Sequence, residues 1–197
     1  MARWRADRVW LVYRGAESFA MAIGWTLAPV YFVQEVGMDP LQLVLTGTFM
    51  ELAYFLFEVP TGVVADSYSR RVSVIVAQAI MGISFVATGL GTSVPLILAA
   101  AALMGFGWTF KSGAIDAWLA DEVGHERLGR EYQRGAQVAR IFTLVGIGAV
   151  AFALVDLRLP IIAGGLVLLA LGVSSCSQCR SPSSSRPHAR RCRRFVT

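Results

Sequence analysis

Seven ionisable side chains lie within long apolar stretches of the sequence, where charge is costly and chemistry is therefore expected. They are Arg14, Glu17, Glu51, Glu58, Lys111, Asp116 and Arg140. A charged group at the centre of a bilayer costs about 2.5 to 3.5 kcal/mol on insertion scales, so such groups tend to face a cavity or a partner. Binding of a charged solute and proton transfer are the reactions these groups could support.

Helical spacing groups some of these residues on common faces. Arg14 and Glu17 are three residues apart, and Trp108 lies three residues before Lys111, so each pair shares a face. Asp116 follows Lys111 by five residues, which turns it about 140° around the helix. Lys111 and Asp116 are therefore expected to have different partners.

Three further charges lie on two other stretches. Glu51 and Glu58 are seven residues apart and share a face, and Arg140 lies one turn from Gln137. At about 1.5 Å per residue, Glu51 falls near the middle of a bilayer, whereas Glu58, like Arg14, Glu17 and Lys111, falls closer to the cytoplasmic side.

The elements that carry these residues are long and apolar. The 197-residue chain is 55% hydrophobic and 16% charged, compared with about 25% charged residues in soluble domains. Stretches of roughly 20 apolar residues can cross a bilayer as helices. We predict an all-α transmembrane domain over residues 1–173, with six spans at about 9–33, 41–65, 72–90, 96–119, 137–154 and 159–173.

The tail after Val173 differs in composition from the rest of the chain. Residues 174–197 contain six arginines, no acid and all three cysteines. Such a polar segment is predicted to be disordered, and we hypothesise that it is translated out of frame from a shifted or truncated gene. Its Cys-x-x-Cys, His188 and Cys192 fit no zinc pattern, so neither a metal site nor a cofactor is expected.

Lysine and arginine alternate between loops in the manner of the positive-inside rule. The N-terminus, the second and fourth loops and the tail are basic, the first and third loops contain no Lys or Arg, and the fifth contains only Arg158. This pattern predicts a multi-pass protein of the plasma membrane with both termini in the cytoplasm.

The loop after the second span carries the most specific motif. Gly62, Asp66, Arg70 and Arg71 match the pattern Gly-x-x-x-Asp-Arg-x-Gly-Arg-Arg/Lys, and the sequence therefore resembles the amino-terminal six-helix half of the major facilitator superfamily. Serines replace the usual Arg and the usual Gly at the two remaining positions. The alternative is a short turn whose arginines only anchor the topology.

The resemblance implies roles for the residues of this motif. Gly62 would allow close helix contact, Asp66 would meet a helix terminus of the opposite half, and Arg70 and Arg71 would bind acidic neighbours. Asp121, Arg127 and Arg130, around the fourth and fifth helices, would supply charge partners at the cytoplasmic face. A solvated charged loop is the alternative for this second group.

The resemblance also implies a 3+3 inverted repeat in which helices one and four line the transport path, two and five contact the other half, and three and six face lipid. We hypothesise that Glu17 and Lys111 face a central cavity and bind substrate or couple to protons, with Arg14 as partner and Trp108 nearby. A purely structural ion-pair network is the alternative.

The function expected from this resemblance is secondary active transport of a small solute by alternating access, with a coupling ion such as H+. Six helices are one half of such a transporter, so a missing carboxy-terminal half or a second copy is the expected partner. The rivals are a membrane enzyme and a nontransporting fragment or scaffold. Outside the tail His125 is the only histidine and no nucleotide-binding loop occurs, so neither a histidine-based enzyme nor ATP hydrolysis is expected. The excess of basic charge belongs to the tail, so nucleic-acid binding is not expected either.

Overall fold

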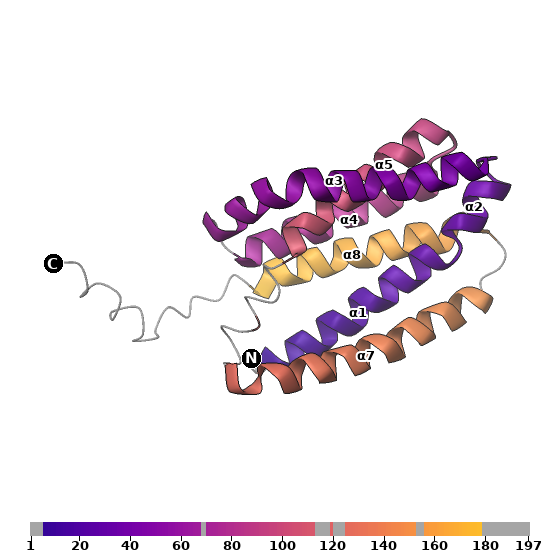
Figure 1. Cartoon of the computed structure of the whole chain (residues 1–197). Helices are drawn as coiled ribbons and strands as arrows, with labels where there is room; N and C mark the ends of the chain where they lie inside the picture. The colour runs from indigo at the N-terminus through magenta and orange to yellow at the C-terminus, as the bar shows by residue number, and fades with distance from the viewer. Residues whose placement is uncertain (1–5, 68–69, 113–118, 120–124, 153–155, 179–197) are drawn as a thin grey trace.

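A computed structural model describes residues 6–67, 70–112, 119, 125–152 and 156–178 of the chain, and all its regular elements are α-helices (Figure 1). The helices are α1 (Ala6–Thr26), α2 (Ala28–Gln34), α3 (Pro40–Ser67), α4 (Arg70–Leu90), α5 (Val94–Lys111), α7 (His125–Phe152) and α8 (Arg158–Gln178). The expectation of an all-α fold is confirmed.

Four helical stretches of the described residues are long and apolar enough to cross a membrane. They are Arg8–Gln34, Pro40–Gly62, Val72–Leu90 and Val94–Lys111, while the apolar part of α8, Arg158–Ser174, is shorter. The first half of α7 is rich in Arg, Glu and Gln. Membrane crossing by α7 and α8 therefore stays a prediction.

The first predicted span is two helices instead of one. Helix α1 ends before Leu27, and α2 begins after it with Pro29 in its first turn. A proline has no N–H to donate, and its ring clashes with the carbonyl four residues earlier, so it starts a helix more readily than it continues one. The interruption at Leu27 follows from this proline.

Three helix ends differ from the ends of the predicted membrane spans. Helix α5 stops at Lys111 and not near residue 119, because Ser112 adopts a non-helical ψ of 127°. Helix α7 begins at His125, inside the predicted loop, and α8 continues to Gln178, five residues past Val173. Hydropathy indicates only the apolar part of a helix. The backbone hydrogen bonds of the helix continue through polar residues until a residue leaves the helical conformation.

The helices pack as an open arc. Neighbours along it are α3, α5, α4, α8, α1 and α7, so α3 and α7 form its two edges. Consecutive long helices run in opposite directions, with the turns after α2, α4 and α7 at one end of the molecule (Figure 1). This alternation is the arrangement that a chain crossing a membrane repeatedly requires.

The packing partners have an internal two-fold relation. The exchange replaces α1 by α5, α3 by α7 and α4 by α8, and the reverse. The packed pair α1·α7 then becomes α5·α3, the pair α1·α8 becomes α5·α4, and the pair α4·α8 is unchanged. All of these pairs are among the closely packed ones. An inverted repeat, which the sequence resemblance implies, would produce this exchange of packing partners.

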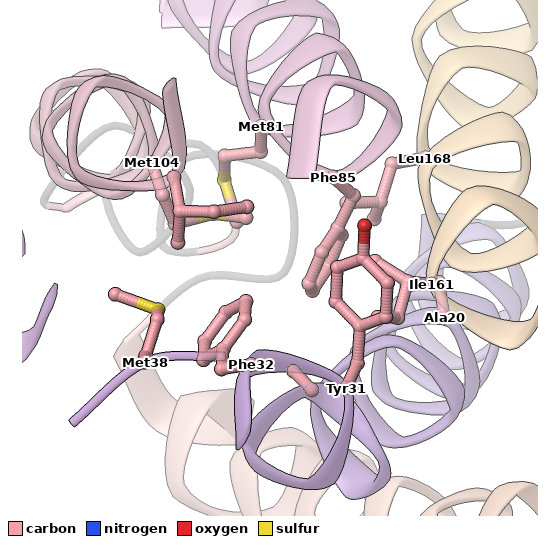
Figure 2. Close-up of a cluster of buried hydrophobic side chains, with 11 residues drawn as sticks. Ala20, Tyr31, Phe32, Met38, Met81, Phe85, Met104, Ile161 and Leu168 are labelled. Atoms are coloured by element: carbon pink, nitrogen blue, oxygen red, sulfur yellow. The ribbon is translucent and has the colours of Figure 1, made fainter. Parts of the chain in front are cut away.

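A buried apolar cluster joins the arc near the end that holds α2. Tyr31 and Phe32 of α2 meet Phe85 of α4, Met104 of α5 and Ile161 of α8 (Figure 2). The Tyr31 hydroxyl donates a hydrogen bond to the Gly91 carbonyl oxygen, so even the polar atom of this ring is satisfied. Helix α2 therefore closes this end of the bundle.

Glycines bring helix backbones into contact at two crossings. A Cβ built on Gly165 of α8 would lie 2.7 Å from the Gly82 carbonyl oxygen of α4, and one built on Gly105 of α5 would overlap the Met50 carbonyl oxygen of α3. Small residues permit such approach between membrane helices. Backbone atoms cannot move away without shifting a whole helix.

We expect Gly105→Ala to lower stability by about 1 to 3 kcal/mol, because its Cβ overpacks the α3 crossing. Gly148→Ala is the matched control, since a Cβ there meets nothing within 4 Å and alanine favours helix. Thermal unfolding of purified protein in detergent measures both changes. Equal midpoints for the two variants would contradict the close approach of α3 and α5.

Candidate functional site

The Glu17 carboxylate is the most deeply buried charge in the described part of the chain. Its residue belongs to α1 and is 2% exposed. Arg14, one turn earlier, reaches Glu17 Oε2 from Nη1 at 3.0 Å, and the Tyr13 hydroxyl donates to Oε1 at 3.0 Å. Helical spacing of three and four residues places these groups together.

Two other helices complete the shell around this carboxylate. Gln78 of α4 donates from Nε2 to Glu17 Oε1 at 2.8 Å and also to the Tyr13 hydroxyl oxygen. Lys111 of α5 places Nζ 2.8 Å from the same Oε1. The structure thus brings Arg14 and Lys111 together at Glu17, and this one side chain links α1, α4 and α5. The role of these residues in substrate binding or proton coupling stays a prediction.

Lys111 owes its position to the end of α5. It is the last residue of that helix, 7% exposed, and its Nζ lies 4.4 Å from the centroid of the Trp108 ring. The predicted common face of Trp108 and Lys111 is therefore present, as a cation–π contact that stabilises a desolvated ammonium. The Glu17 carboxylate and the Trp108 indole together hold the Lys111 ammonium in place.

The cluster of Tyr13, Arg14, Glu17, Gln78 and Lys111 carries one negative and two positive charges. Its amide oxygen, Gln78 Oε1, is buried and accepts no hydrogen bond from the described residues. The cluster can thus hold Glu17 ionised, and it has positive charge left over. An anion or a proton arriving here would change the pairing of Lys111.

Tyr13 and Gln78 are the site residues that sequence reasoning missed. Gln78 is fully buried in a span noted for having no ionisable residue. A side-chain amide in an otherwise apolar stretch was the available signal, because a polar group in hydrocarbon needs a partner. Tyr13 lies four residues before Glu17, which also predicts contact.

Three of the predicted charges lie away from this cluster. Glu51 and Glu58 are exposed on α3, where Glu58 accepts a hydrogen bond from the Tyr54 hydroxyl at 3.0 Å, and Arg140 is exposed on α7. Asp116 lies outside the described residues. The charges on the edge helices α3 and α7 are therefore separate from the cluster around Glu17.

The motif residues are only partly described. Gly62 is exposed on α3, Asp66 belongs to the last turn of that helix, and Arg70 and Arg71 open α4. Their side chains, like all of Asp121, fall outside the described residues. Arg127 and Arg130 are exposed in the first turns of α7, so the proposed pairing across this face stays a prediction.

Another contact at this end of the molecule escaped the sequence analysis. Trp10 of α1 donates from Nε1 to the Glu131 carbonyl oxygen of α7 at 3.2 Å. Glu131 is itself buried and binds Arg134 at 3.1 Å, while its Oε2 atom has no hydrogen-bond partner in the part of the chain that the structure describes. The pair Trp10 and Glu131 therefore anchors the start of α7 to α1.

Comparisons with known proteins agree with this architecture. A family model described as the Major Facilitator Superfamily matches residues 14–190. The chain is also similar to the "Uncharacterized MFS-type transporter YxaM" of Bacillus subtilis (strain 168), with 25% identity over 134 residues. The aligned segment covers 68% of this chain and 33% of that protein, so the match spans a third of the relative's length.

We expect Lys111→Met to lower stability by about 3 to 5 kcal/mol, the usual result of removing one partner of a buried ion pair. The double variant Glu17→Gln with Lys111→Met should recover much of this loss, because no unpaired carboxylate remains. Thermal unfolding of the three proteins measures the coupling. Additive losses in the double variant would show that the two side chains do not interact.

Proposed function

The chain belongs to the major facilitator superfamily, and from this premise we propose that it serves secondary active transport of a small solute by alternating access. The observation that carries the proposal is the Glu17 cluster. It lies where α1, α4 and α5 meet, and it concentrates charge in the interior of helices that also share a buried apolar cluster. Members of this family are transporters rather than enzymes, which disfavours the enzymatic alternative.

In the proposed mechanism, protonation of Glu17 is the coupling step. Ionised Glu17 accepts the Lys111 ammonium at 2.8 Å. A proton on the carboxyl would cancel that attraction, leaving Lys111 and Arg14 as two cations without a counter-ion. An anionic group of the solute would then compensate them. Proton and solute would thus be linked through one ammonium group.

Binding of a proton or substrate at this cluster would also change the positions of the helices. Glu17 joins α1 to α4 and α5 by charge-assisted bonds, and these are stronger than neutral ones. Changing the charge of the carboxyl weakens links between both halves of the internal repeat. A packed bundle responds to such a change by discrete helix movement.

The proposed setting is the plasma membrane, with both termini in the cytoplasm and the protein crossing several times. The basic N-terminus, second and fourth loops support this orientation. Lipid, a small solute and a coupling ion such as H+ are the proposed partners, together with a second six-helix unit that completes the transport path. No cofactor and no nucleic acid enter the proposal.

Reconstitution into liposomes with an imposed proton gradient tests this function. Glu17→Gln should abolish gradient-driven uptake of an anionic solute from a screened panel, because the carboxyl can no longer exchange a proton. Glu35→Gln is the matched control, since it removes an exposed carboxylate at the other end of α1–α2 and should leave uptake unchanged. Saturable binding without flux in the wild-type protein would instead support the scaffold alternative.

A further inference from the structure

A cavity of about 90 Å³ lies among α1, α2, α3, α4 and α5, near the end of the bundle that holds α2. No ionisable side chain is among the described residues that line it. The hydroxyl groups of Thr46 and Ser84, which also line it, donate to backbone carbonyl oxygens and are therefore already satisfied. Most of the surface is apolar and comes from Trp25, Phe32, Met50, Phe85, Ile97 and Met104.

This lining determines what kind of group the cavity can hold. Figure 2 shows three of its side chains, Phe32, Phe85 and Met104, around a common space. A polar group placed there would lose its hydrogen bonds to water and find few partners, whereas a hydrocarbon group would lose nothing. The cavity therefore suits the apolar part of a ligand.

The cavity and the Glu17 cluster lie on the same three helices. On each helix a residue of the cluster and a residue of the cavity are seven or eight positions apart: Glu17 and Trp25 on α1, Gln78 and Phe85 on α4, and Lys111 and Met104 on α5. At about 1.5 Å per residue, the two sites are about 10 to 12 Å apart along the helix axes. Three helices thus hold one polar and one apolar site at one separation.

The side chains between the two sites are apolar and adaptable. Met21 of α1 and Met81 of α4 lie one turn from the Glu17 cluster toward the cavity, and Trp108 lies one turn before Lys111 on α5. Methionine side chains are flexible and fill irregular spaces. Trp25 and Trp108 are exposed, so a ligand can reach both sites from the surface of the bundle.

The cluster end of this path selects an anion. It holds one carboxylate against two cations, Lys111 and Arg14, and the proposed transport mechanism assigns an anionic group of the solute to them. The planar guanidinium of Arg14 matches the geometry of a carboxylate, which can accept two parallel hydrogen bonds from it. A carboxylate is thus a suitable head group.

The cavity end selects the shape of the apolar part. An apolar cavity of about 150 Å³ holds a benzene molecule, so a cavity of about 90 Å³ fits the end of an alkyl chain better than a ring. C–C bonds of about 1.5 Å that meet at about 111° advance an extended chain about 1.25 Å per carbon. The separation of about 10 to 12 Å therefore corresponds to roughly eight to ten carbons.

We propose that the solute is an amphipathic carboxylate with an unbranched alkyl chain of about eight to ten carbons. Its carboxylate binds Lys111 and Arg14, and the end of its chain occupies the cavity at Phe85 and Met104. A shorter carboxylate reaches only the cations, and a neutral alcohol of the same length reaches only the cavity. The inference rests on the proposed transport function and adds the class of substrate to it.

Binding of labelled decanoate to the protein in lipid nanodiscs tests the substrate class, with partition into protein-free nanodiscs subtracted. We expect saturable binding that butanoate, hexanoate, octanoate and decanoate displace with about fourfold higher affinity per added methylene. Octanol, which has the chain without the charge, should displace it at least about tenfold less well than octanoate. A purely non-saturable signal, or equal displacement by butanoate and decanoate, would overturn the proposal.

Gly47→Leu is designed to fill the cavity. Gly47 lines it on α3, and a Cβ built there meets nothing within 4 Å, so the helix can accommodate a leucine. Affinity for decanoate should fall at least about tenfold, because roughly two methylenes lose their burial, while affinity for butanoate should not change. Gly148→Leu on α7 is the matched control, since that position is equally open and lies away from the cavity.

Ala101→Leu fills the same cavity from α5 and provides an independent block. Unfolding midpoints identify which of the variants are folded. If folded Gly47→Leu and Ala101→Leu both bind decanoate as tightly as Gly148→Leu does, the cavity holds no part of the solute and the proposal is wrong.

Uptake into liposomes under a proton gradient separates this inference from the transport proposal. Decanesulfonate serves as the solute, because its permanent charge keeps it from crossing lipid unaided. Saturable uptake that Gly47→Leu reduces supports both proposals. Uptake of a different anion that decanoate does not inhibit would refute only the substrate class. Decanoate binding without gradient-driven uptake of decanesulfonate would refute only the transport function.

Discussion

Burial of the Glu17 carboxylate is the constraint on which the rest of the bundle depends. A lone carboxylate in a low-dielectric interior would be prohibitively costly, so the surrounding helices must supply donors. They do so from three directions, with Arg14 and Tyr13 on the same helix, Gln78 on α4 and Lys111 on α5. Satisfying this one group fixes the rotation of three helices relative to one another.

Close contacts between helix backbones give that cluster a rigid frame. The Gly82 and Gly165 contact holds α4 against α8, and Gly105 lets α3 approach α5 at the Met50 backbone. These crossings belong to helix pairs that the internal two-fold either exchanges with another pair or maps onto themselves. The same packing solution is used twice, which leaves α3 and α7 as equivalent edges with free faces.

Much of the central site was predictable because helical spacing is a local property. Arg14 and Glu17, or Trp108 and Lys111, must share a face whenever their segments are helical, and the structure brings each pair together. Gln78 could not be assigned in this way. Its role depends on which face of α4 meets α1, and the spacing of residues within α4 does not show that face.

The sequence by itself determined the helical class, the approximate positions of most apolar segments and the family. Hydropathy and short motifs depend only on residues that are close together in the chain. Tertiary structure alone decided that Lys111 pairs with Glu17 while Glu51 and Arg140 lie outside at the edges. All of these are charges in apolar helices and look alike in the sequence. Their environments differ because helix packing, a property of the whole bundle, selects which faces turn inward.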